Sequence, residues 1–157
     1  MSLRAESPAR PVSAAAAAGL ARVRLGSLAV LMLVVVQYGI GMYVNLYVTV
    51  PRADHGHGLG SAIANGPAVL SVHAVIGLLL GLGAVGVLVQ AVIARHLGAI
   101  ALSAVGLFAL ASASVTGASF TSSGDPVDSM GMAVLTGVGL LCYAANLYLL
   151  RPPSQRG

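Results

Sequence analysis

Long runs of apolar residues, separated by short polar segments, dominate the pattern of this chain. Each run is longer than the roughly 20 residues that an α-helix needs to cross the hydrocarbon core of a bilayer. None shows the alternation of apolar and polar residues expected of membrane-spanning strands. Because backbone groups in lipid must be satisfied internally, the pattern predicts four transmembrane helices, at about residues 27–50, 67–94, 97–120 and 129–150.

The segments outside these runs are predicted to be tails. Residues 1–26 are rich in Ala, Pro, Ser and Arg and are expected to form a flexible N-terminal tail, and residues 151–157 a short C-terminal one. A signal peptide is disfavoured because the first apolar run is much longer than the apolar region of such a peptide. Residues 27–150 are therefore predicted to form one all-α domain, a polytopic transmembrane four-helix bundle.

The composition favours a membrane protein and excludes several other classes. Hydrophobic residues make up 57% of the chain and charged residues 8%, whereas an ordinary soluble domain is about 25% charged. This hydrophobicity excludes intrinsic disorder for most of the chain, because disordered segments have low hydrophobicity. A single cysteine, Cys142, excludes a disulfide scaffold. The expected surroundings of the chain are a lipid bilayer.

The arginines predict how the chain is oriented. All of them except Arg52 lie in the N-terminal tail, in the turn around Arg95 or in the C-terminal tail. The positive-inside rule places these three segments in the cytoplasm, so both termini are predicted to be cytoplasmic. Because the charge follows topology rather than one exposed face, no nucleic-acid partner is expected. The Arg-only, Ala- and Gly-rich composition favours a bacterial cell membrane.

His73 is the outstanding polar residue within the predicted spans. It lies about 9 Å past Pro67 at 1.5 Å per residue, in the outer half of the membrane. Gly77 and Gly81 follow on nearly the same helix face. Two interpretations stay open. Either small residues let two helices pack closely while His73 forms a hydrogen bond across their interface, or the glycines leave room for a flat macrocycle whose iron His73 ligates.

A haem site would need a second ligand or an open position, and the fourth span offers Met130 and Met132. Residues 73–76 (HAVI) align with residues 132–135 (MAVL), so Met132 is equivalent to His73 if the second hairpin repeats the first. The two methionines lie about 200° apart around a helix, so only one of them can face the interior. The alternative is that both contact lipid or fill the core.

A polar stripe along the first span supports an inward polar face. Gln37, Gly41 and Asn45 are spaced by four residues and share one side of the predicted helix. Interhelical hydrogen bonds are one interpretation of such a stripe. The other is a polar pocket for a head group, a propionate or a quinone oxygen.

The first outer loop contains a candidate metal site. Asp54, His55 and His57 lie close together there, and two imidazoles with a carboxylate can hold Cu or Zn. The alternative is a solvated Gly-rich loop, because a closed ligand set of a structural site is missing. If His73 and an outer methionine lie beneath this loop, a copper site with mixed His and Met ligands is a further hypothesis.

Two short motifs in the first two spans carry a family resemblance. Gln37-x3-Gly41-x2-Val44 is followed by the polar outer loop and then by residues 71–77 (SVHAVIG). Together, within about residues 34–90, these motifs resemble one four-helix half of the haem A synthase family.

The resemblance implies a four-helix bundle in which histidines near the outer ends of the second and fourth helices ligate haem. His73 matches the first of these histidines, whereas Met130 or Met132 lies near the position of the second. The chain is half as long as members of the family, and their catalytic acid motif is not evident in its first outer loop. The resemblance therefore implies either a haem-binding relative or a remnant bundle without cofactor, rather than haem A synthesis.

The leading functional hypothesis is a small integral membrane protein that binds b-type haem in the outer half of the bundle, for electron transfer or haem handling. One alternative is a cofactor-free accessory or assembly subunit with a membrane-protein partner or a second copy of the chain. Another is a metal-binding or small-solute transport protein that uses His73, His55 and His57. No common catalytic motif is evident, so enzymatic activity stays open. The residues assigned to the haem site are His73, Met132, Met130, Gly77 and Gly81.

Overall fold

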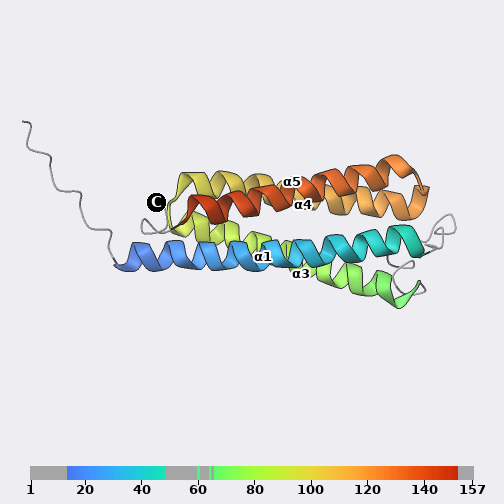
Figure 1. The fold of residues 1–157 in the computed structure, drawn as a ribbon, viewed down its shortest axis with the longest axis horizontal. Coiled ribbons are helices and arrows are strands. Elements are labelled where there is room, and N and C mark those ends of the chain that lie inside the picture. Colours follow the sequence, from blue (N-terminus) through green and yellow to red (C-terminus); the bar gives the residue numbers. More distant parts are fainter. Residues whose placement is uncertain (1–13, 49–59, 61–63, 65, 152–157) are drawn as a thin grey trace, which may run out of the picture.

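The computed structural model describes residues 14–48, 60, 64 and 66–151. This part of the chain contains no strand, and it holds helices that are each long and apolar enough to cross a membrane. The predicted all-α transmembrane four-helix bundle is therefore confirmed, whereas the cytoplasmic position of the termini stays a prediction. The helices, shown in Figure 1, are α1 (Ala14–Tyr47), α3 (Ala68–Ile93), α4 (Leu97–Ser123) and α5 (Pro126–Leu149).

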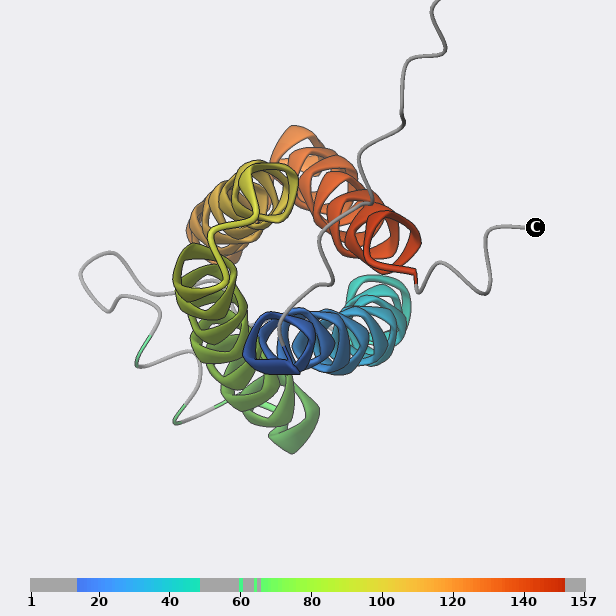
Figure 2. The same cartoon turned by 90° about the vertical axis from the view of Figure 1, so that its left-hand side faces the viewer.

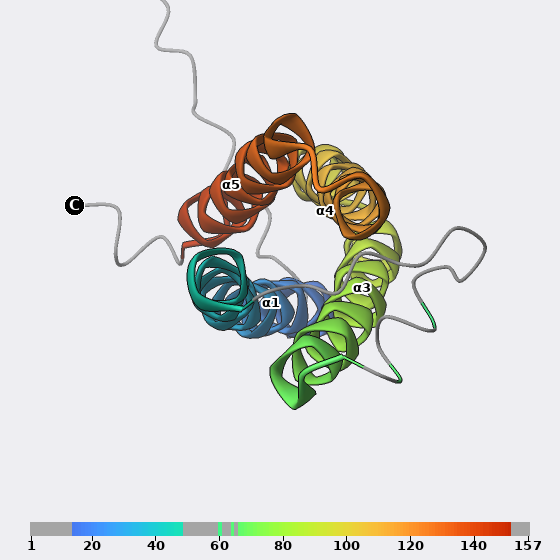
Figure 3. The same cartoon turned by 90° about the vertical axis from the view of Figure 1, so that its right-hand side faces the viewer.

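The helices are arranged as an antiparallel ring in the order α1, α3, α4, α5 (Figures 2 and 3). α1 and α4 each pack against both α3 and α5. Consequently α3 lies diagonally opposite α5, and α1 lies diagonally opposite α4. We call the end with the α3–α4 turn the inner end, following the predicted topology, and the end with the α4–α5 turn the outer end.

α1 begins well before the predicted first span. Residues 14–26, which the sequence assigned to the N-terminal tail, form its first turns. The physical reason is the alanine run over residues 14–18, since alanine has the highest helix propensity. With 34 residues, α1 is about 50 Å long at 1.5 Å per residue, longer than the roughly 30 Å of hydrocarbon. Its first turns, with Arg22 and Arg24, can therefore extend beyond the hydrocarbon.

The α4–α5 turn is built from helix-capping residues. Gly124 ends α4 with φ 66°, a left-handed conformation that suits glycine. Asp125 then caps α5, because its Oδ1 accepts a hydrogen bond from the backbone N–H of Val127 at 2.9 Å. Pro126 occupies the first helical position, where its missing N–H costs little. These caps start α5 earlier than the predicted fourth span.

Large apolar side chains cover the outside of the bundle, as a lipid surface requires. Met32, Leu78, Phe108 and Leu141 are exposed examples, one on each described helix. Inside, toward the inner end, buried positions recur every three or four residues along each helix. The inner half of the core is filled by the larger apolar cluster, which contains Val23, Val30, Val34, Leu80, Ala84, Val87, Ala91, Ala99, Leu110 and Tyr143.

A second, smaller cluster of buried apolar residues lies toward the outer end and contains Val44 and Leu70. Between the two clusters, the inward positions of the outer half are held by glycine and by polar side chains. Gln37, Gly41, His73 and Gly77 are the examples on α1 and α3. The candidate site lies in this region.

Candidate functional site

His73 lies on α3 at the interface with α1 and is half-buried. The Nε2 atom of Gln37, on α1, lies 3.2 Å from His73 Nε2 and donates to the backbone oxygen of His73 at 2.9 Å. His73 Nδ1 and Gln37 Oε1 are both buried and have no hydrogen-bond partner within the described part of the chain. One ring nitrogen is therefore engaged by Gln37, and the other has no partner.

Glycines on both helices accommodate this pair of side chains. A Cβ atom added at Gly41 would come within 3.0 Å of His73 Cε1, and one added at Gly77 would come within 3.1 Å of Gln37 Nε2. A Cβ at Gly81 would meet nothing within 4 Å. The room expected beside Gly77 is thus used by Gln37, whereas Gly81 faces open space.

Met132 has a matching position on the opposite side of the bundle. It lies on α5, is half-buried, and its Sδ atom would be 3.0 Å from a Cβ added at Gly117 of α4. Met130 instead is 70% exposed. The tertiary structure therefore directs Met132 toward a neighbouring helix and Met130 outward.

The two glycine contacts lie at nearly the same depth. Ser129 Oγ donates to Asn45 Oδ1 at 3.0 Å, which fixes the register of α5 against α1. Counted from this bond toward the inner end, Gly41 lies four residues from Asn45 on α1, and Met132 lies three residues from Ser129 on α5. At 1.5 Å per residue these steps are about 6 and 4.5 Å, so Gly41 and Met132 lie at similar distances along their helices from this hydrogen bond.

His73, Gly41, Met132 and Gly117 therefore form one layer of the bundle, which we call the His/Met layer. Its two side chains with metal-binding atoms come from the diagonal helices α3 and α5, and its two glycines come from α1 and α4. Sequence reasoning had grouped Gly41 with a polar stripe and had missed Gly117. Only the register between helices identifies both glycines as the positions that make room.

The His/Met layer fits the residue types that a haem iron requires. An imidazole and a thioether are an established axial pair, and their combination raises the reduction potential. A metal-ligating histidine usually donates its second ring N–H to an acceptor. The Gln37 nitrogen beside the ring is itself a donor, so this acceptor would have to be Gln37 Oε1, which has no partner within the described part of the chain. Ligand binding here would require the side chains of His73 and Met132 to leave their glycine contacts.

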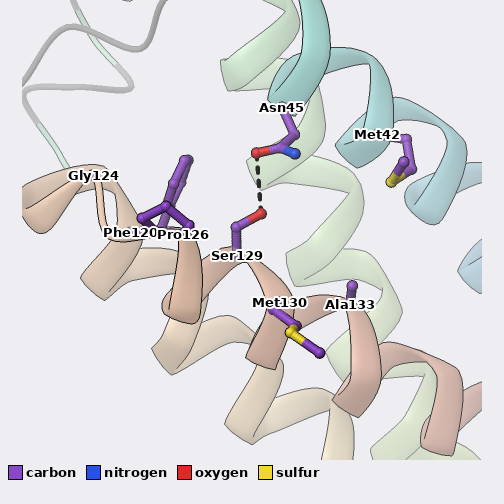
Figure 4. A pocket seen from close by; sticks show the side chains of 8 residues that line it. All are labelled: Met42, Asn45, Phe120, Gly124, Pro126, Ser129, Met130 and Ala133. Atoms are coloured by element: carbon purple, nitrogen blue, oxygen red, sulfur yellow. Dashed lines mark hydrogen bonds between the residues drawn. The ribbon is translucent and has the colours of Figure 1, made fainter.

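A pocket of about 520 Å³ opens at the outer end, between α1 and the α4–α5 hairpin (Figure 4). The hydrogen-bonded pair Asn45 and Ser129 lies in it, one turn outward from the His/Met layer. Its other lining residues are largely apolar and include Met42, Phe120, Met130 and Ala133.

The loop metal hypothesis is left untested, because His55 and His57 lie outside the described residues. Within the described ranges, no group of three or more His, Cys, Asp or Glu side chains could hold a metal ion.

Comparison of the chain with models of known protein families, with curated proteins and with solved structures gave no match. The resemblance to one half of haem A synthase therefore stays a prediction. Without a matching protein, the function of this chain has to be inferred from the geometry of the His/Met layer and of the outer pocket.

Proposed function

We propose that this protein binds b-type haem in the outer half of its bundle, in the plasma membrane of a bacterial cell, for electron transfer or haem handling. His73 of α3 and Met132 of α5 are the proposed axial ligands. The observation that supports this proposal is the His/Met layer, in which two metal-binding side chains on diagonal helices share one depth with a glycine on each of the other two helices.

The protein's own residues would position and tune the site. The Gln37 amide lies beside one nitrogen of His73 and would orient the ring by accepting its N–H at Oε1. The thioether of Met132 favours the reduced state more than a second imidazole would. Gly41 and Gly117 keep the two remaining helix faces free of side chains. A bound haem would supply reversible one-electron transfer.

The proposal is tested by titrating haem into the purified protein in lipid nanodiscs and recording the Soret band. Wild type is expected to bind haem stoichiometrically, and His73→Ala to lose the band. Met132→Leu should keep haem but lose the charge-transfer band of thioether ligation and shift the reduction potential downward. Met130→Leu, a matched change at the exposed methionine, should behave as wild type. A wild type that takes up no haem, or a His73→Ala variant with an unchanged Soret band, would contradict the proposal.

A second candidate function is a cofactor-free accessory or assembly subunit of a larger membrane complex. The contact between Gln37 and His73 favours it, because this hydrogen bond already joins α1 to α3 without a cofactor. This function predicts a colourless protein that copurifies with one fixed membrane partner, or as a homo-oligomer. His73→Leu should then lower the stability of the α1–α3 contact while no haem binds to wild type.

A further inference from the structure

The outer pocket is distinct from the His/Met layer and is not used by the proposed haem site. It lies between α1 and α5, one turn nearer the outer end, and has a volume of about 520 Å³. Pockets for small molecules have volumes of about 300–1,000 Å³ and combine apolar walls with a few placed polar groups. This pocket falls within that range of volume and has largely apolar walls with one polar pair, and it is open rather than enclosed.

Of the polar groups in the pocket, the amide nitrogen of Asn45 can donate hydrogen bonds to a ligand. Asn45 Oδ1 accepts from Ser129 Oγ at 3.0 Å. The amide nitrogen of Asn45 carries two N–H donors and has no hydrogen-bond partner among the described residues. In Figure 4 this nitrogen is directed away from Ser129, on the side of Met42. A ligand in the pocket would therefore be held by an acceptor atom facing Asn45.

The charge around the pocket selects a neutral ligand. None of its lining residues is charged. The nearest ionisable side chains on the adjoining turn are Asp125 and Asp128, both acidic. Among the described residues none offers a cation to an anionic phosphate or carboxylate in the pocket, and these carboxylates would repel it. The fitting chemistry is an apolar molecule with an uncharged carbonyl oxygen.

The walls favour a flat ring over a polar head group. Met42 and Met130 supply adaptable thioether side chains, which contact aromatic rings favourably. Phe120 supplies an aromatic surface, and Ala133 leaves space at the base of the pocket. Since the pocket lies at the outer end of membrane-spanning helices, a ligand dissolved in the bilayer can reach it.

From these observations we infer that the outer pocket binds the ring of a membrane-dissolved quinone, with Asn45 donating a hydrogen bond to one ring carbonyl. This inference goes beyond the proposed haem site, because binding in the pocket requires neither haem nor His73. The ester carbonyl of a lipid offers the same acceptor chemistry and is the competing source of a carbonyl in this pocket.

The test uses the full-length protein, without added haem, in nanodiscs of ester-linked or ether-linked phosphatidylcholine. A photoreactive azidoquinone is cross-linked, and labelled peptides are mapped by mass spectrometry with and without excess decylubiquinone. Labelling is expected on α1 and α5 around Met42 and Met130, and the unlabelled quinone should compete with it. Asn45→Leu should lower this labelling about fivefold, the effect of one lost hydrogen bond.

Matched variants separate ligand binding from folding. Ala133→Leu fills the pocket and should also abolish the competed labelling. Ser129→Ala removes the bond between α1 and α5 but keeps the Asn45 amide, so labelling should fall less than in Asn45→Leu. Met32→Leu changes a lipid-facing methionine elsewhere on α1 and should have no effect. Helix content by circular dichroism confirms that each variant is folded.

Three outcomes would overturn the inference. One is labelling that spreads over the lipid-facing surface without competition by decylubiquinone. Another is labelling at the pocket that survives both Asn45→Leu and Ala133→Leu. The third is labelling that appears only in ether-linked nanodiscs while ester-linked lipid copurifies with the protein, which would assign the pocket to lipid. A protein that takes up no haem in the titration described above but still binds quinone would reject the haem proposal and support this one.

Discussion

Glycine at positions 41 and 117 serves packing at the expense of helix propensity. Glycine in a helix interior is about 1 kcal/mol less favourable than alanine. Here, however, a Cβ would come within 3.0 Å of His73 Cε1 at one position and of Met132 Sδ at the other. The two glycines therefore allow side chains from neighbouring helices to lie directly on the backbone.

We expect Gly41→Ala to lower the free energy of unfolding by about 1 to 2 kcal/mol, because a shift of the His73 imidazole away from the new methyl group would disturb its contact with Gln37. Gly117→Ala should cost less, since the end of the Met132 side chain is flexible. Gly39→Ala is the control, because its Cβ would meet nothing within 4 Å. Unfolding in SDS, followed by circular dichroism, measures all three. Equal stability of Gly41→Ala and Gly39→Ala would disprove this account.

A buried hydrogen bond joins α4 to α5 in the inner half. Asn146 Nδ2 donates to Ser103 Oγ at 3.0 Å, and both residues are fully buried. A double-mutant cycle with Ser103→Ala and Asn146→Leu should give a coupling energy of about 0.6 kcal/mol, and at most about 1.7, as for other bonds between membrane helices. The same SDS titration measures it. Strict additivity of the two variants would show that the bond does not contribute.

Capping residues determine where α4 ends and where α5 begins. The α4–α5 turn combines a left-handed Gly124 with the Asp125 cap, and Ser123 Oγ donates to Asp128 Oδ2 at 2.8 Å. These local bonds satisfy backbone groups that the helix ends leave open. They lie in the turn between two spans, and they hold α4 and α5 as one hairpin.

Asp125→Ala is expected to destabilise the hairpin by about 1 kcal/mol, because the N–H of Val127 loses its acceptor. Amide hydrogen exchange in the first turn of α5 should accelerate, while exchange at its inner end stays unchanged. Asp125→Asn is the matched control, since its side-chain oxygen still accepts a hydrogen bond. If the alanine and asparagine variants exchange at the same rate, the cap does not stabilise this turn.

The His/Met layer depends on register between elements rather than on any one helix. Its parts lie on all four described helices, and the contact between Asn45 and Ser129 relates one pair of helices to the other. A change that shifts α5 along α1 would move Met132 away from the depth of His73. Under the proposed function, haem affinity is expected to respond to the packing of α1 against α5 as well as to the ligands themselves.

For the whole molecule, the distribution of arginine predicts cytoplasmic termini. Alkaline phosphatase fused after Gly124 should be active, whereas fusions after Arg95 or Arg151 should be inactive, because the enzyme requires an oxidising compartment outside the cytoplasm. Green fluorescent protein fused at the same positions should give the opposite pattern. A reversed set of activities would show that the termini lie outside the cytoplasm, and it would place the His/Met layer in the inner half of the membrane.

Much of the fold follows from the sequence because crossing a bilayer sets a minimum length of apolar helix. The four spans could be located from their apolar runs, and their ends differ from the observed helices mainly where Ala14 to Ala18 or the Asp125 cap add helical turns. His73 could be singled out for a similar reason, since a polar side chain is conspicuous within an apolar span.

The sequence by itself thus determined the number and type of the membrane-spanning elements and one candidate ligand. The tertiary structure decided which sides of the helices meet. Lipid-facing and core positions are both apolar in this chain, so hydrophobic periodicity does not distinguish them. The choice between Met130 and Met132, the partnership of Gln37 with His73 and the role of Gly117 therefore became visible only once the helices were packed against one another.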